Sequence, residues 1–119
     1  MITGLGHVQV AMPPGGEDQA RDYYGGVLGM IELPKPPALV ARGGCWFLSG
    51  TALLHLGVEE PFAPALKAHP CFIVEDLDAV ESELVREGYA CAPDDGVPGV
   101  RRFHTHDPFG NRLEFEQTT

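Results

Sequence analysis

The sequence predicts an α+β protein built from two βαβββ modules, which form a curved mixed sheet with helices on its outer face. Strand-type alternation and helix-type periodicity follow each other in the same order in both halves of the chain. Gly29 and Gly88, which end the two expected helices, are separated by the same interval as His55 and Glu114, which fall on the last expected strand of each half. A repeat of roughly 60 residues is a stronger guide to architecture than any short motif.

The first module, residues 1–60, opens with an alternating apolar and polar segment that predicts a strand. Two prolines and two glycines end it, and acidic Glu17 and Asp18 suit the first turn of a helix. A proline-rich loop is expected between the two strands that follow this helix. The expected elements are a strand at 6–12, a helix at 17–28 and strands at 30–33, 45–48 and 52–57.

The second module, residues 68–119, repeats this order after a linker that contains two prolines. Asp107-Pro108-Phe109-Gly110 predicts a type I turn, with Asp first, Pro second and Gly fourth, so two strands meet there. The helix is amphipathic, with Leu77, Val80, Leu84 and Val85 on its apolar side. The expected elements are a strand at 69–74, a helix at 76–88 and strands at 89–92, 100–106 and 111–117.

Composition restricts the classes of function. The 119 residues suffice for a single domain, 1–119, with its own core. A net charge of −9 disfavours binding to nucleic acid or to anionic membranes. Three scattered cysteines indicate a reducing compartment, and neither a membrane-spanning run nor a signal peptide is present. We therefore expect a cytoplasmic protein that acts on a small molecule.

Four residues that can ligate a metal fall on the first or last expected strand of a module, on the face away from the helices. Leu54 and Leu56 flank His55 as Leu113 and Phe115 flank Glu114. Each residue alone is more often a hydrogen-bonded or surface side chain. Their joint placement favours one metal site, with ligands His7, His55, His69 and Glu114.

Other polar and aromatic residues are expected near this site. His104 and Arg102 share a strand face; His104 could move protons and Arg102 could pair with an anionic group of the substrate, although both also suit the rim of a cavity. The concave face would carry further candidates for substrate binding, which suit the ordinary core nearly as well. These are Trp46, Leu48 and Leu53.

Four segments resemble the vicinal oxygen chelate superfamily, the group of glyoxalases, bleomycin-resistance proteins and extradiol dioxygenases. Residues 23–30 are similar to the family segment F/Y-Y-x-x-x-L-G-M. The other three are Gly6-His7-Val8, residues 74–78 before the second helix, and residues 107–111 before Leu113-Glu114. The resemblance implies a homodimer and a divalent metal ion, nickel, zinc, manganese or iron, held by His7, His55, His69 and Glu114.

The resemblance also implies a metal-dependent glyoxalase-like lyase or isomerase whose substrate chelates the ion through adjacent oxygens. The ion would act as a Lewis acid, and Glu114 or His104 would move the proton. Two positions depart from relatives. His55 stands where enzymes like glyoxalase I usually carry Glu or Gln, and Gln9, assigned to substrate binding, stands where fosfomycin-resistance enzymes carry Thr.

Two alternative functions remain open from the sequence. One is a bleomycin-resistance-type protein that sequesters a small hydrophobic ligand without chemistry. The other is a small extradiol-type dioxygenase, in which His7, His69 and Glu114 would hold iron.

Overall fold

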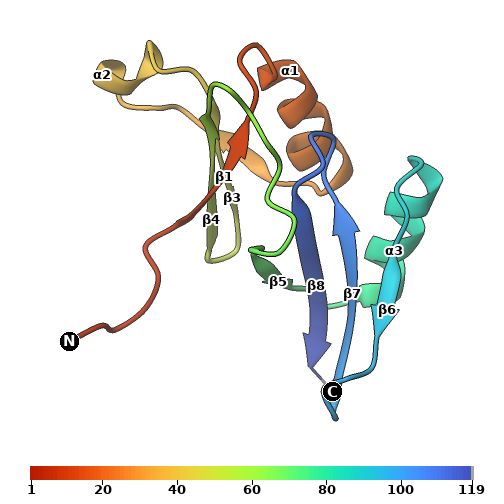
Figure 1. Ribbon diagram of the computed structural model, residues 1–119. Helices are drawn as coiled ribbons and strands as arrows, with labels where there is room; N and C mark the ends of the chain where they lie inside the picture. The colour runs from red at the N-terminus through yellow and green to blue at the C-terminus, as the bar shows by residue number, and fades with distance from the viewer. Residues whose placement is uncertain (119) are drawn as a thin grey trace. The chain divides into compact units, whose positions relative to one another are not determined.

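The computed structural model describes residues 1–118 and divides into two compact units, Met1–Ala63 and Pro64–Thr119 (Figure 1). Each unit contains one four-stranded mixed sheet, of order β1-β4-β3-β2 in the first and β5-β8-β7-β6 in the second. In both sheets the first strand pairs parallel with the last, and the other pairs are antiparallel. The α+β class and the two βαβββ modules predicted from the sequence are therefore confirmed.

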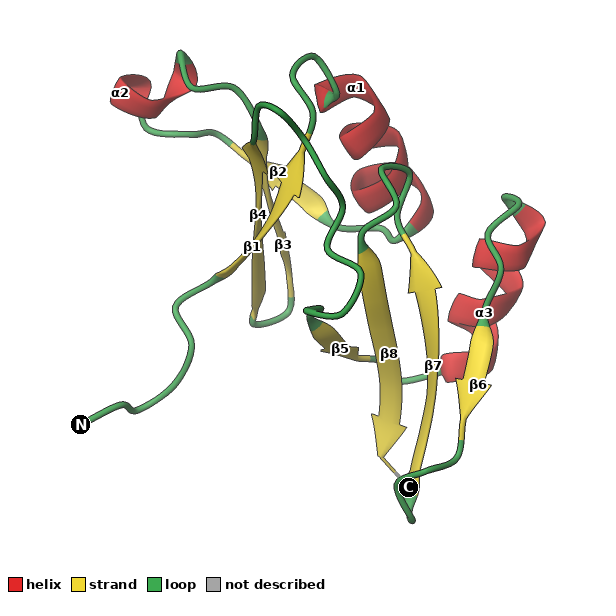
Figure 2. Cartoon of the chain, viewed as in Figure 1, coloured by secondary structure: helices red, strands yellow, loops and turns green. Residues whose placement is uncertain are grey.

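The helices and strands of each unit are distinguished by colour in Figure 2. The first unit contains β1 Val8–Met12, α1 Glu17–Ala20, the π-helical segment η1 Arg21–Val27, β2 Ile31–Leu33, α2 Pro37–Val40, β3 Cys45–Ser49 and β4 Ala52–Val58. The second contains β5 Cys71–Ile73, α3 Leu77–Arg86, β6 Ala92–Asp94, β7 Val100–His106 and β8 Arg112–Thr118. None of the helices within residues 1–118 has the length and apolarity needed to cross a bilayer.

The core of the first unit lies between its sheet and the helical segment formed by α1 and η1. Tyr24 of η1 is fully buried, and its ring lies 5.8 Å from that of Phe47 on β3. Met12 and Leu54 are also fully buried beneath this helix-covered face. Burying these large side chains is the main source of stability for the unit.

The core of the second unit is a row of three phenylalanines across neighbouring strands. Phe115 on β8 lies 5.6 Å from Phe72 on β5 and 5.5 Å from Phe103 on β7, measured between ring centroids. Leu77 and Leu84 of α3 are buried, and the Leu77 N–H donates to Gln117 Oε1 on β8 at 2.7 Å. Helix α3 is thereby attached to the strand that carries Glu114.

The two helices end at the glycines that the repeat had paired. Gly29 has φ +72° and Gly88 has φ +92°, a left-handed conformation that favours glycine. After α3, the Gly88 N–H donates to the Val85 carbonyl and the Tyr89 N–H to the Leu84 carbonyl. This pair of hydrogen bonds is the Schellman motif, which satisfies carbonyls at the helix end.

The turn between β7 and β8 is the one predicted from Asp107-Pro108-Phe109-Gly110. The Gly110 N–H donates to the Asp107 carbonyl at 3.0 Å, as a type I turn requires. Asp107 Oδ1 also accepts from the N–H groups of Phe109 and Asn111, each at 2.9 Å. These hydrogen bonds hold the conformation of the turn, and the turn sets the register of β7 against β8.

Several predicted boundaries are wrong. β1 begins at Val8 and β5 at Cys71, so His7 and His69 precede their strands. The proline-rich loop contains the short helix α2, which proline can start because it needs no N–H there. The strand predicted at 89–92 lies instead at Ala92–Asp94, since Tyr89 serves the helix cap.

Two predictions about the helices also need correction. The first helix is not a regular α-helix, because residues 21–27 are wound as a π-helix; the Leu28 N–H donates to the carbonyl of Tyr23, five residues earlier. In α3, Val85 is 57% exposed and does not belong to the buried side of the helix.

Candidate metal centre

Three side chains line up in one row across each sheet. Residues paired across neighbouring strands place their side chains on the same face. The pairing gives the rows Gln9–His55–Trp46 in the first unit and Cys71–Glu114–His104 in the second. His55 and Glu114 therefore occupy equivalent register positions in the two sheets. In the second unit this row lies on the face opposite the row of phenylalanines.

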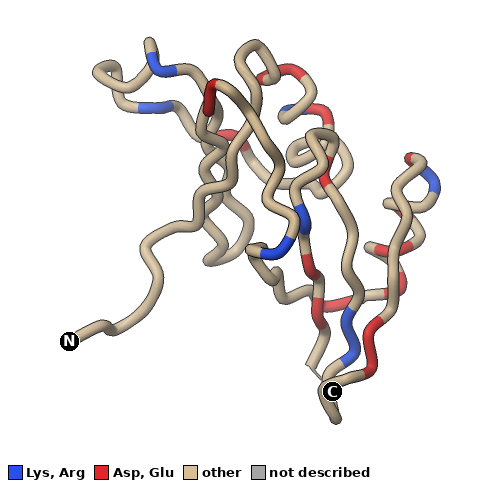
Figure 3. Tube along the Cα trace, in the orientation of Figure 1, with Lys and Arg blue, Asp and Glu red and all other residues tan. Residues whose placement is uncertain are grey.

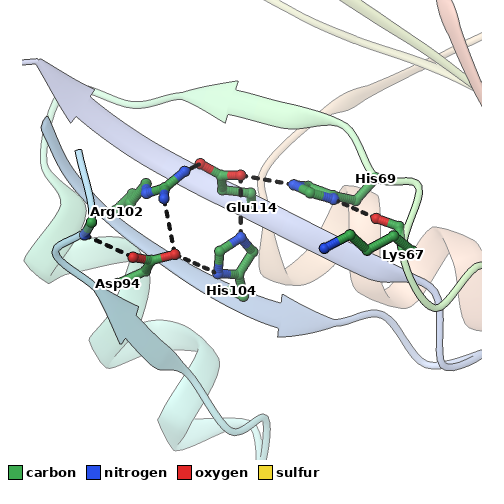
Figure 4. A network of polar contacts seen from close by, with 7 residues as sticks. Lys67, His69, Asp94, Arg102, His104 and Glu114 are labelled. Atoms are coloured by element: carbon green, nitrogen blue, oxygen red, sulfur yellow. Dashed lines mark hydrogen bonds and ion pairs between the residues drawn. The ribbon is translucent and has the colours of Figure 1, made fainter.

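Glu114 lies at the centre of the row in the second unit (Figure 4). The side chain is buried, and its Oε1 lies 2.8 Å from His69 Nε2 and 3.2 Å from His104 Nε2. Burial alone would raise the pKa of Glu114, but hydrogen bonds from His69, Cys71 and Arg102 hold it below its usual value. Glu114 is therefore an anion facing two imidazoles, rather than the solvated side chain that base rates favour.

His69 has an oxygen acceptor on each ring nitrogen. Nδ1 lies 2.8 Å from the Lys67 carbonyl, and Nε2 lies 2.8 Å from Glu114 Oε1. Both contacts can be hydrogen bonds only if each ring nitrogen carries a hydrogen. Alternatively, a metal ion could replace the hydrogen between Nε2 and Glu114. The carbonyl at Nδ1 selects the tautomer whose Nε2 lone pair is free to ligate, a common arrangement for metal-binding histidines.

Two groups in the second unit could hold a metal ion. The ligand atoms of His69, His104 and Glu114 all lie within 4.8 Å of one another, as do those of Cys71, Glu114 and Glu116. Burial, and after it the charges of Glu114 and Glu116, raises the pKa of the Cys71 thiol to about 12. Because a thiol must lose its proton to ligate, the group with two histidines fits a metal better.

In the first unit, His55 lies between two other aromatic rings. Its ring centroid is 4.0 Å from that of His7 and 4.0 Å from that of Trp46, and both pairs are stacked. Within residues 1–118, His55 Nε2 is buried without a hydrogen-bond partner. Burial, and after it the nearby His7, lowers the pKa of His55, so the neutral ring with a free lone pair is favoured.

These contacts allow a test of whether the residues fit a metal ion. A buried polar atom without a partner is costly unless something binds it, and His55 Nε2 is such an atom. Imidazole nitrogens with one carboxylate are the donor set typical of zinc, iron and nickel sites. His69, His104 and Glu114 therefore fit a divalent transition metal in the second unit. The predicted ligands His7 and His55 lie in the first unit.

The predicted substrate-binding residues of the first unit share the face of His55. Leu48 and Leu53 pair with each other, two positions along from Trp46 and His55, and all three hydrophobic side chains are partly exposed. The Gln9 side chain lies against Gly57, where a Cβ atom would come within 2.6 Å of Gln9 Nε2. Contact of these residues with a substrate stays a prediction.

Arg102 is surrounded by carboxylates of its own unit. Its Nη1 lies 3.2 Å from Glu114 Oε2, and its Nη2 lies 2.9 Å from Asp94 Oδ2. Figure 3 shows the basic and acidic positions of β7 and β8 side by side, in keeping with the pairing of Arg102 with Glu116. The predicted role of Arg102 in binding a substrate anion stays a prediction, since both terminal nitrogens already have partners.

Sequence reasoning missed Asp94 and Cys71. Asp94 pairs with Arg102 in the register of β6 and β7, but the strand had been expected three residues earlier. Pro93 and Gly96 give this segment the composition of a turn, so the sequence did not predict the strand at the sheet edge. Cys71 could have been found because it follows His69 by two residues and so shares a strand face with Glu114.

The chain was compared with known proteins. No protein-family model matches the sequence, and no curated protein matches it. A crystal structure of a protein from Bacillus anthracis, assigned to the glyoxalase family, is 48% identical in sequence, with a TM-score of 0.96. The match covers 100% of this chain and 98% of that one.

More distant structures share the fold. The fosfomycin resistance protein FosX of Listeria monocytogenes is 15% identical, with a TM-score of 0.78, over 100% of this chain and 96% of its own. A glyoxalase/dioxygenase of Nostoc punctiforme is 22% identical, with a TM-score of 0.73, over 93% of this chain and 89% of its own. At these identities the likeness concerns the fold alone.

Proposed function

Because this chain belongs to the glyoxalase family of the vicinal oxygen chelate superfamily, we propose that it is a metal-dependent lyase or isomerase. Its substrate is a small molecule that chelates the ion through adjacent oxygens. The observation that carries the proposal is the contact of Glu114 Oε1 with both His69 and His104, because Glu114 is a buried carboxylate whose pKa its hydrogen bonds lower.

The proposed ligands are His7 and His55 from the first unit and His69 and Glu114 from the second. His55 Nε2 has no hydrogen-bond partner within residues 1–118. His69 Nδ1 faces the Lys67 carbonyl, so an ion could replace the hydrogen between His69 Nε2 and Glu114 Oε1. A divalent ion, when bound, supplies Lewis acidity to substrate oxygens.

His104 is the residue best placed to move a proton. Its Nε2 lies 3.2 Å from Glu114 Oε1 and its Nδ1 lies 3.9 Å from Asp94 Oδ2, so the ring has a carboxylate near each nitrogen. A histidine ring placed between two carboxylates can carry a proton between them and a substrate. Glu114 is poorly suited to this step, because its oxygens already accept from His69 and Arg102.

The experiment that tests the proposal is metal analysis of protein purified without chelators, followed by assays with each metal. We expect one nickel, zinc, manganese or iron ion per chain. We also expect turnover on one class of substrate among 2-oxoaldehydes, thioesters of coenzyme A and fosfomycin. Protein that binds no divalent metal but binds a hydrophobic antibiotic tightly would instead support the sequestering function.

A dioxygenase is a second candidate, favoured by the group His69, His104 and Glu114. Two histidines and one carboxylate are the ligand set of many non-haem iron oxygenases. Anaerobic loading with ferrous iron, followed by catechol and oxygen, separates the candidates. Oxygen uptake coupled to ring opening identifies a dioxygenase, whereas a lyase or isomerase consumes no oxygen. The predicted homodimer is tested on the same preparations by light scattering.

A further inference from the structure

We propose that Arg102, held in place by Asp94, binds one carboxylate oxygen of Glu114 and so leaves the other, Oε1, to the histidines; both are positioning residues. The inference rests on the proposed metal-binding function, because it concerns how the chain prepares a ligand. It goes further by giving roles to Asp94, which no sequence pattern suggested, and to Arg102, whose predicted role was to bind the substrate.

The two oxygens of Glu114 have separate sets of partners (Figure 4). Oε1 faces His69 at 2.8 Å and His104 at 3.2 Å, whereas Oε2 accepts from Arg102 Nη1 at 3.2 Å. None of these contacts links Oε2 to a histidine. A carboxylate without such a division could turn about its last torsion and exchange its oxygens.

Arg102 is itself held by Asp94. Its Nη2 donates to Asp94 Oδ2 at 2.9 Å, and the Gly96 N–H donates to Asp94 Oδ1 at 2.9 Å. The backbone of the turn after β6 thus fixes Asp94, Asp94 fixes Arg102, and Arg102 fixes Glu114. The planar guanidinium suits this bridge because its nitrogens point to two acceptors at a set angle, which an ammonium cannot reproduce.

This arrangement determines how Glu114 can ligate an ion. Carboxylates bind metals through one oxygen or through both. With Oε2 given to Arg102, Glu114 offers Oε1 alone, which lowers the coordination number by one. A site with fewer protein ligands keeps positions for the two oxygens of a chelating substrate, as catalytic metal sites do.

The neighbouring residues provide matched controls. Arg101 lies next to Arg102 on β7 and donates to Asp78 at 2.6 Å, outside the network around Glu114. Asp95 follows Asp94 and is exposed. Arg101→Gln therefore changes the net charge as Arg102→Gln does, and Asp95→Ala changes it as Asp94→Ala does. Neither control alters the contacts among Asp94, Arg102 and Glu114.

The first experiment needs no metal. In chelator-treated protein labelled with ¹⁵N-histidine, we expect Arg102→Gln to shift the ring nitrogen signals of His69 and His104, because Oε1 moves relative to both. Asp94→Ala is judged by His69 alone, because Asp94 Oδ2 itself lies 3.9 Å from His104 Nδ1. Arg101→Gln and Asp95→Ala should leave these signals in place. Unchanged His69 and His104 signals in Arg102→Gln overturn the inference, whether or not the protein is a metalloenzyme.

The second experiment follows Co²⁺ by its visible absorption and by competition with a chromophoric chelator. We expect Arg102→Gln to change the absorption bands, as a second oxygen of Glu114 enters, and to weaken affinity roughly tenfold to a hundredfold. Arg102→Lys should fall between wild type and Arg102→Gln. Adding Asp94→Ala to Arg102→Gln should weaken affinity by less than Asp94→Ala does alone, because Asp94 acts on Glu114 through Arg102.

The outcomes separate the two hypotheses. If the wild type binds no Co²⁺, the proposed function fails, and the histidine signals alone decide the inference. If the wild type binds Co²⁺ and Arg102→Gln has the same spectrum and affinity, the proposed function stands and the inference fails.

Discussion

His69 is held at both ring nitrogens, by the Lys67 carbonyl and by Glu114. Replacing it removes one proposed ligand and leaves the buried carboxylate without its nearest partner. We expect His69→Ala to lower the affinity for Zn²⁺ or Ni²⁺ by about a hundredfold or more, measured by chelator competition. His106→Ala is the control, since His106 is exposed on the same sheet. Equal losses in both variants would contradict the assignment.

The lowered pKa of His55 has a consequence for stability. The folded protein favours the neutral ring, so this contribution is fully present above the ordinary histidine pKa of about 6.5. It is lost as the pH falls through the lower pKa of the folded state. In urea denaturation of chelator-treated protein from pH 8 to pH 5, we expect His55→Gln to lose less stability than wild type. Parallel curves for the two proteins would refute this account.

Cys71 is exposed, yet its thiol is a poor nucleophile. Burial of the sulfur, followed by the charges of Glu114 and Glu116, raises its pKa to about 12, so little thiolate exists at pH 8. We expect slow alkylation of Cys71 by iodoacetamide, and faster reaction in Glu116→Gln, which removes one of the charges. Peptide mass spectrometry after timed quenching measures the rates. Rapid reaction of the wild type would show that the thiolate is not suppressed.

At the scale of elements, α3 begins at a side-chain cap. Asp76 Oδ1 accepts from the Ala79 N–H at 3.0 Å. Removing such a cap costs about 1 kcal/mol, so Asp76→Ala should lower the free energy of unfolding by that amount. Asp78→Ala leaves the cap in place and removes an exposed ion pair with Arg101 and one first-turn charge, so it should cost less. Thermal unfolding of both variants makes the comparison.

Long elements with strong local signals were predicted well. β7 was expected at 100–106 and is Val100–His106, because alternation and a specific turn fix both strands of the hairpin. Short elements at the edge of a sheet were predicted poorly. β6 contains Pro93 and has the composition of a turn, and only pairing with β7 makes it a strand. The π-helical winding of η1, where Tyr23 and Tyr24 are buried, was not predicted either.

The sequence could predict which candidate residues share a face of a sheet, because the alternation of side chains along a strand decides this. His55 and Glu114 lie at equivalent positions of equivalent strands, as the repeat required. The alternation of residues along the strands could not predict which side chains contact one another. The stack on His55 and the bridge through Asp94 depend on pairing registers and rotamers that one sequence does not specify. His104 emerged from the structure as a further candidate ligand as well as a proton carrier.

At the scale of the whole molecule, the shared metal site is a prediction that one fluorophore can test. Trp46 is the only tryptophan and stacks on His55 in the first unit, whereas Glu114 belongs to the second. If one ion takes ligands from both units, Cu²⁺ should quench Trp46 emission in the wild type and much less in Glu114→Gln. Fluorescence titration measures this; quenching that is indifferent to Glu114 would indicate separate sites.

The equivalent rows in the two sheets also bear on how such a protein can change its choice of ion. Each row rests on the hydrogen-bond ladder of its own unit, so a ligand exchanged in one half leaves the other half's scaffold intact. Placing a carboxylate at position 55 would give the halves matching acidic centres. Such an oxygen-rich set suits hard cations such as Mn²⁺ or Mg²⁺ better than the nitrogen-rich set proposed for the present chain.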